Sequence, residues 1–170
     1  AVYNKSNVTV IILDNRATAM TGGQQHPGTG KTLMGEDATR VDLFKLCHAR
    51  GGGSVRELDA YDYDTATAMI KEEMARSGPS VIITTRPCVL MPQRIMDEPY
   101  VIDADLCNAC SACFKISCPA IAASHETNKH GNPKAVIDET LCTGCTLCAQ
   151  ICPTEAIMLK SQFGKTGVHQ

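Results

Sequence analysis

The 170-residue chain contains no tryptophan, and aromatic residues make up only 4% of it. Neither charge is in marked excess, because 16 lysines and arginines stand against 18 aspartates and glutamates. This balance offers no basic surface for nucleic acid. No apolar run approaches the ~20 residues that cross a bilayer, and residues 8–13 are too few for the apolar core of a signal peptide. We therefore expect a cytoplasmic protein that binds neither nucleic acid nor a membrane.

Cysteine, in contrast, is abundant, with ten in a chain that carries no export signal. Because the cytoplasm keeps thiols reduced, metal binding explains them better than disulfides do. Eight of them lie in an internal repeat, in which "VIDADLCNACSACFKISCPAI" from Val101 is echoed by "VIDETLCTGCTLCAQICPTEAI" from Val136. Cys47 and Cys88 lie outside the repeat, and we interpret them as inert buried thiols.

The second copy of the repeat has the spacing C-x2-C-x2-C-x3-C-P, which is that of bacterial ferredoxins with two [4Fe–4S] clusters. The first copy has one extra residue before its last cysteine. Structural zinc sites, the alternative, usually pair two C-x2-C knuckles that lie about a dozen or more residues apart. The small residues between the ligands favour close approach of backbone N–H groups to a cluster: Ala109, Ser111, Ala112, Thr143, Gly144 and Thr146.

In the two-cluster ferredoxins that this repeat resembles, the last cysteine of each run crosses to the other cluster. The resemblance therefore implies two ligand sets. The first is Cys107, Cys110, Cys113 and Cys152, and the second is Cys142, Cys145, Cys148 and Cys118.

The first half alternates strand and helix patterns. Residues 8–13, 55–58 and 81–85 predict strands, the first of them buried on both faces. Residues 42–50 predict a helix, and Asp64 is expected to cap a second one that buries Ala66, Met69, Ile70 and Met74 and turns Glu73 to water. This alternation predicts an α/β fold: part of a doubly wound parallel sheet, followed by a small α+β two-[4Fe–4S] ferredoxin-like domain.

The predicted boundaries are a first domain over residues 1–91, a linker over 92–99, the ferredoxin-like domain over 100–160 and a tail over 161–170. The polar segment from His125 to Pro133 is expected to be a surface loop between the two cysteine runs.

The run "GTGKT" at residues 28–32 invites comparison with a phosphate-binding loop, G-x-x-x-x-G-K-[ST]. The comparison fails, because the position of the first glycine is occupied by Gln25 and the preceding strand ends far upstream. Taken alone, Asp14-Asn15 reads as an ordinary turn at the end of a strand and Gly22-Gly23 as a flexible loop.

The sequence "ILDNRATAMTGGQQHPGTG", which lies upstream of a two-cluster ferredoxin module, resembles the thiamine-diphosphate domain of the 2-oxoacid:ferredoxin oxidoreductases. The resemblance implies that the Asn15 side chain and the Ala17 carbonyl bind the Mg²⁺ of the cofactor. It also implies that a loop lies close to the diphosphate, formed by Thr21, Gly22, Gly23 and Gln24. The family's earlier magnesium motif is expected before Ala1, so we expect this segment alone to be inactive.

The resemblance further implies oxidative decarboxylation of an arylpyruvate such as indolepyruvate to an acyl-coenzyme A. Two electrons would leave one at a time through the clusters to a soluble ferredoxin, and a beta subunit would complete the enzyme. Three alternatives stay open: a related enzyme acting on pyruvate, 2-oxoglutarate or phenylglyoxylate, a non-catalytic electron-transfer protein, and a zinc-stabilised interaction module. The sequence assigns no catalytic residue.

Overall fold

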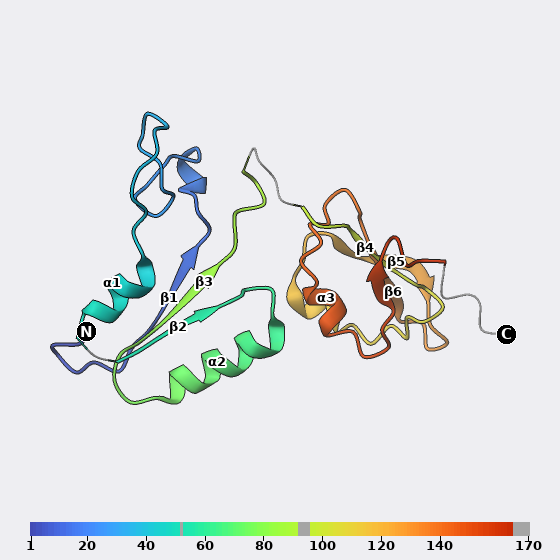
Figure 1. Ribbon diagram of the computed structural model, residues 1–170. Helices are drawn as coiled ribbons and strands as arrows, with labels where there is room; N and C mark the ends of the chain where they lie inside the picture. The colour runs from blue at the N-terminus through green and yellow to red at the C-terminus, as the bar shows by residue number, and fades with distance from the viewer. Residues whose placement is uncertain (52, 92–95, 165–170) are drawn as a thin grey trace. The chain divides into compact units, whose positions relative to one another are not determined.

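The computed structural model describes residues 1–51, 53–91 and 96–164 (Figure 1). The chain divides into two compact units, Ala1–Ile95 and Met96–Gln170. The predicted linker and tail include residues 92–95 and 165–170, which lie outside the described residues. Within the described ranges, no helix has both the length and the apolar character that a membrane span requires.

The first unit contains a three-stranded parallel sheet with the strand order β1-β3-β2 (Figure 1). The strands are β1 (Thr9–Asp14), β2 (Ser54–Leu58) and β3 (Ser80–Thr85). Central β3 is buried from Ser80 to Ile83, as expected for a strand with neighbours on both sides. The predicted parallel sheet is thus confirmed.

Strand β1 departs from its prediction. Its side chains are not covered on both faces, because Val10 and Ile11 are 42% and 43% exposed and Leu13 is 74% exposed. In this chain β1 is an edge strand that pairs with β3 alone among the described strands. A continuous run of β-branched residues is typical of central and edge strands alike in a parallel sheet, so the pattern could not separate the two.

The two helices of this unit, α1 (Leu43–Ala49) and α2 (Tyr63–Ala75), each begin after an aspartate. Asp42 caps α1 by accepting a hydrogen bond from the Lys45 N–H at 2.9 Å. Asp62 caps α2 in the same way, at 3.0 Å from Thr65 N, so the prediction of Asp64 as the cap is wrong. Asp64 instead lies in the first turn of α2, where its negative charge also suits the helix dipole.

Helix α2 packs Met69 against Leu58 and Ile82, with Ala66 and Ile70 beside them. Two predictions about its faces are wrong, because Met74 is 71% exposed while Glu73 is only 2% exposed. Glu73 lies four residues after Met69 and therefore shares its buried face. Its carboxylate accepts a hydrogen bond from Ser54 Oγ at 2.9 Å and lies 3.6 Å from Arg56 Nη1, which offsets part of the cost of burying the charge.

The turn before β2 provides a test of backbone packing. Gly53 has φ of +82°, and a Cβ added to it would lie 2.0 Å from the Pro79 carbonyl oxygen. Gly51 has φ of +85° with open space around it. Gly51→Ala should therefore cost about 1–2 kcal/mol for the left-handed backbone alone, whereas Gly53→Ala should cost more than ~3 kcal/mol because strands must also separate. Denaturant unfolding followed by circular dichroism measures both, and equal losses would contradict the packing described here.

The second unit contains two antiparallel strand pairs. Strand β4 (Tyr100–Ile102) pairs with β7 (Ile157–Leu159), and β5 (Ile121–Thr127) pairs with β6 (Pro133–Ile137). The predicted surface loop from His125 to Pro133 is therefore shorter, because both of its ends belong to a hairpin. A short helix includes the third cysteine of each run: η2 (Cys113–Ile116) contains Cys113, and α3 (Leu147–Gln150) contains Cys148.

The two copies of the repeat make equivalent hydrogen bonds. Asp103 N donates to Ala156 O and Asp138 N donates to Ala120 O, both at 2.8 Å. Each aspartate carbonyl then accepts from the first cysteine of its own copy, Cys107 at 3.0 Å and Cys142 at 3.1 Å. This internal symmetry holds both cysteine runs against one shared core, whose buried side chains include Ile137 and Ile157.

Candidate metal and cofactor sites

The cysteine loops, residues 107–113 (the first loop) and 142–148 (the second loop), have matching backbone conformations. Ala109 and Ser111 have φ of 59° and 62°, and the equivalent Gly144 and Thr146 have 72° and 67°. A left-handed conformation costs a non-glycine residue about 1–2 kcal/mol. Alternation of right- and left-handed residues turns successive N–H groups toward one side, where they bind anions. Both loops are therefore shaped to surround a negatively charged group.

A small pocket with a volume of about 20 Å³ lies beside the first loop. Its lining includes four cysteines, of which three belong to the first loop and one, Cys152, to the second copy of the repeat. The pocket is otherwise lined mainly by small and apolar residues, among them Ala109, Ala112, Ala135 and Ile157. Chain segments far apart in sequence thus bring four thiols to one cavity.

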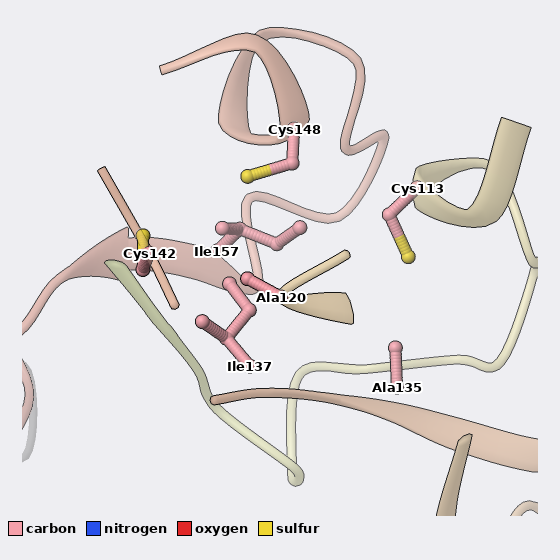
Figure 2. Close-up of a cluster of buried hydrophobic side chains, with 7 residues drawn as sticks. All are labelled: Cys113, Ala120, Ala135, Ile137, Cys142, Cys148 and Ile157. Carbon is pink, nitrogen blue, oxygen red and sulfur yellow. The ribbon is translucent and has the colours of Figure 1, made fainter. Parts of the chain in front are cut away.

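The causes that raise the pKa values of two buried thiols indicate which cysteines lie near them. Burial raises the pKa of the Cys113 thiol, and electrostatic interaction with Cys107, Cys110 and Cys152 raises it further. Burial likewise raises the pKa of Cys148 to about 12, with further contributions from Cys145, Cys142 and Cys118. Each thiol is therefore close to two cysteines of its own loop and to one from the other copy, and Figure 2 shows Ile157 among the cysteines of both groups.

The extra residue in the first copy has a local explanation. The helix η2 ends at Ser117, which has left-handed φ and ψ of 56° and 37°, and its N–H donates to Phe114 O. The equivalent α3 ends at Ile151 with φ of −99° and no left-handed residue. One left-handed residue thus turns the chain toward Cys118, so the longer spacing is absorbed before that cysteine.

The spacing of these cysteine side chains bears on the kind of metal centre that they can hold. Within residues 1–51, 53–91 and 96–164, no group of three or more His, Cys, Asp or Glu side chains is placed to hold a single metal ion. Four thiolates converge on one zinc ion with Zn–S bonds of about 2.3 Å. Each thiolate of an iron–sulfur cubane binds a different iron, so the four sulfur atoms stand farther apart. The cysteine geometry therefore suits a cluster better than zinc.

The second candidate site follows the carboxyl end of β1. The buried Asp14 carboxylate accepts from Arg16 N at 3.3 Å and from Arg40 Nη2 at 3.1 Å. Asn15 Oδ1 accepts from Ala17 N at 3.0 Å, and Asn15 O accepts from Cys88 N at 3.0 Å. Every residue of this turn is thus fixed by its neighbours, and the amide oxygen of Asn15 keeps a lone pair for a hard cation such as Mg²⁺.

The predicted diphosphate loop, residues 21–24, is held by hydrogen bonds among its own side chains and Thr18. Thr18 Oγ1 donates to Gln24 O at 2.8 Å, and Thr21 Oγ1 donates to Gln24 Oε1 at 2.7 Å. The Gln24 amide nitrogen in turn donates to Thr21 O. Gly22 and Gly23 have φ of 106° and 73°, a conformation that suits glycine, and Gly23 N donates to Thr18 O at 3.2 Å. The oxygen atoms of this loop are chemically suited to Mg²⁺, and glycine lets a diphosphate approach the backbone closely.

Sequence reasoning missed the residues that hold this edge of the sheet. Arg86 binds both carboxylate oxygens of Asp59, at 2.7 and 2.5 Å, and its guanidinium lies 4.3 Å from the centre of the Tyr61 ring. Arg86 N also donates to Asp14 O at 3.3 Å. The Asp59–Arg86 pair therefore ties the segments after β2 and β3 to the turn that carries Asn15. The pair spans 27 residues, so no local pattern could have indicated it.

Arg86→Lys tests this tie, because lysine keeps the charge but cannot form the two-pronged contact. If this turn holds a diphosphate through Mg²⁺, its affinity should weaken about 3- to 10-fold, as one charge-assisted hydrogen bond is lost. Titration calorimetry measures the change. Arg56→Lys is the matched control, since Arg56 forms its ion pairs with Glu72 and Glu73 of α2. Equal weakening in both variants would show that Arg86 has no particular role at the turn.

Comparison with known proteins finds one family model within each of the two units. Residues 1–84 match the thiamine pyrophosphate enzyme C-terminal TPP binding domain, and residues 135–158 match the 4Fe-4S binding domain. The chain is 39% identical to the indolepyruvate oxidoreductase subunit IorA of Thermococcus kodakarensis, 36% to that of Pyrococcus abyssi and 32% to that of Methanothermobacter thermautotrophicus. Each match covers 92% of this chain and 24% of the relative, so the chain spans about a quarter of their length.

Proposed function

Because this chain is a relative of the IorA subunits of indolepyruvate oxidoreductases, we propose that it forms part of such an enzyme and carries the electrons away from its reaction centre. The observation that supports this most strongly is that a TPP-binding domain and two groups of four cysteines occur in one chain. The substrate is a 2-oxoacid of the arylpyruvate class, indolepyruvate, and the products are carbon dioxide and an acyl-coenzyme A.

Two [4Fe–4S] clusters are part of the proposal. Cluster 1 is held by Cys107, Cys110, Cys113 and Cys152. Cluster 2 is held by Cys142, Cys145, Cys148 and Cys118. The left-handed loop residues, the pocket beside the first loop and the grouping of the thiolates all support these sets.

The electron balance explains why two clusters are needed. Oxidation of one 2-oxoacid with coenzyme A releases carbon dioxide, a proton and two electrons. Each cluster accepts one electron at a time, so two clusters together hold the two electrons that one turnover releases. A soluble ferredoxin then removes these electrons, and a beta subunit completes the enzyme.

Thiamine diphosphate, when bound, supplies the chemistry for decarboxylation. The chain's own residues would bind and orient it: the Asn15 amide oxygen and the Ala17 carbonyl at Mg²⁺, and the loop from Thr21 to Gln24 beside the diphosphate. The Arg40 ion pair and the Arg86 N–H support the turn that presents Asn15.

The first unit is proposed to belong to a doubly wound domain. The chain passes from β1 over β3 to β2 and then back to β3. Right-handed crossovers in opposite directions would place α1 and α2 on opposite faces of the sheet. We assign the protein to the cytoplasm, since all ten cysteines are in the described ranges and none is in a disulfide.

The complete enzyme, made anaerobically with its partner subunit, tests the function. We expect coenzyme A-dependent reduction of methyl viologen with indolepyruvate, and about eight iron atoms per chain with little zinc. Faster turnover of pyruvate, 2-oxoglutarate or phenylglyoxylate would assign the chain to a related oxidoreductase. Iron without any oxidation of 2-oxoacids would favour an electron-transfer protein, and stoichiometric zinc would favour an interaction module.

A further inference from the structure

The two cysteine loops share a conformation but differ in exposure to solvent. In the first loop Asn108, Cys110 and Ser111 are exposed, whereas no residue of the second loop is exposed. Cys110 is the one exposed cysteine among the ten, all of which lie in the described ranges. If both loops hold clusters, cluster 1 is therefore the one with a ligand at the surface.

The opening segment of the second unit covers the second loop. Gly144 packs so tightly that a Cβ would lie 2.6 Å from Asp97 Cβ and 2.8 Å from Glu98 O. The Glu98 carboxylate is held in turn by Ser161 Oγ at 2.9 Å, and Tyr100 N donates to Cys142 Sγ at 3.4 Å. Nothing could approach the second loop at this side without displacing that segment.

Exposed lysines flank the uncovered first loop. Lys115 follows Cys113 by two residues, in η2. Lys129 lies in the turn between β5 and β6, and that turn is tied to the first loop because Asn128 Nδ2 donates to Asn108 O at 3.0 Å. The acidic groups nearby include Asp103, Asp105 and Glu126, of which Glu126 pairs with Lys134 at 3.7 Å.

More acidic side chains surround the second loop than the first loop. Asp97 and Glu98 cover it, and Asp138 and Glu139 precede Cys142. Among the residues that the structure describes, Lys160 is a basic residue on this side, and it is paired with Glu139 at 2.5 Å. Negative charge near a cluster disfavours the added electron, so the more balanced surroundings of cluster 1 favour reduction there.

We propose that a soluble electron-carrier protein with an acidic docking face binds over the first loop and takes electrons from cluster 1. This proposal rests on the proposed function and adds to it the docking surface and the exit cluster. In each encounter one electron passes from reduced cluster 1 to the oxidised carrier, and no bond is made or broken. Complementary charge speeds such encounters and makes their rate depend on salt.

Charge reversal in the complete enzyme tests the surface. With a soluble acidic two-cluster ferredoxin as acceptor, Lys115→Glu with Lys129→Glu should lower kcat/KM for the acceptor about 10-fold or more at low salt. The loss should shrink as salt is added, because exposed charges are screened. Reduction of methyl viologen, which needs no docking surface, should stay unchanged. Lys160→Glu, the matched control beside the second loop, should change the ferredoxin rate less than about 2-fold.

Several outcomes would decide against the proposal. A larger loss in Lys160→Glu than in the double variant would move the docking surface to the second loop. If the double variant kept the unaltered kcat/KM for ferredoxin, the charges of Lys115 and Lys129 would play no part in docking. Iron analysis detects a folding defect, and Lys129→Glu alone provides a variant in the hairpin turn, outside the cysteine runs themselves. If the unaltered enzyme reduces no methyl viologen with any 2-oxoacid, the proposed function is wrong. That result would be distinct from a failure of the docking surface, which concerns the ferredoxin rate alone.

Discussion

A chain with both Cys152 and Cys110 replaced by serine is expected to keep about four iron atoms, whereas one with Cys152 and Cys145 replaced should keep almost none. Cys152 and Cys110 line the same pocket, so the second change removes a ligand from a cluster that is already lost. Cys145 belongs to the other group, around Cys148. Removing one ligand from each group therefore destroys both clusters.

Iron and sulfide analysis of anaerobically purified variants measures this difference. The reciprocal pair gives an internal control: Cys118→Ser with Cys145→Ser should spare cluster 1, although Cys118 lies in the first copy of the repeat. The opposite result would be half the iron in Cys152→Ser with Cys145→Ser and none in Cys152→Ser with Cys110→Ser. It would mean that each cysteine run supplies all four ligands of a single cluster. The crossed ligand sets would then have to be abandoned.

Gly144→Ala is expected to destabilise the second unit far more than Gly131→Ala. Both glycines have positive φ, 72° and 79°, so each alanine pays about 1–2 kcal/mol for the left-handed backbone. Gly131 has open space around it, but a Cβ on Gly144 would lie within 2.8 Å of both Asp97 and Glu98. Overpacking of this kind adds about 1–3 kcal/mol and would lift the covering segment off the second loop.

Thermal bleaching of the cluster absorbance under anaerobic conditions measures the effect. Gly144→Ala should lower the midpoint by more than twice the shift in Gly131→Ala, and its cluster 2 should become accessible to chelators. A shift in Gly144→Ala no larger than in Gly131→Ala would mean that Asp97 and Glu98 do not press on the second loop.

The cofactor chemistry was more predictable than the packing. Cysteine spacing is local, so it indicated a ferredoxin-type module, and the strand and helix patterns indicated the parallel sheet that the structure contains. The spacing could not show that the second loop is covered and the first is not. That difference comes from Asp97 and Glu98, which contact a loop far along the chain.

Errors in the first unit have the same origin. Glu73 of α2 has the residue type of a surface position, yet its carboxylate is buried because Ser54 and Arg56 of β2 supply partners. The apolar run in β1 suits central and edge strands alike, and in this chain β1 lies at the sheet edge. Near the Asn15 turn, Arg40 and Arg86 act across long sequence separations. Each of these features depends on tertiary contacts that no local pattern encodes.

The most direct test of the account is whether substrate reduces the clusters of this chain. Electron paramagnetic resonance on the complete enzyme, without acceptor, should be silent as isolated and should show reduced [4Fe–4S] signals after indolepyruvate and coenzyme A are added. In the variant with Cys152 and Cys110 replaced by serine, the signal of cluster 1 should be missing while that of cluster 2 remains. Conversion of indolepyruvate with both clusters staying oxidised would contradict the claim that this chain carries the electrons.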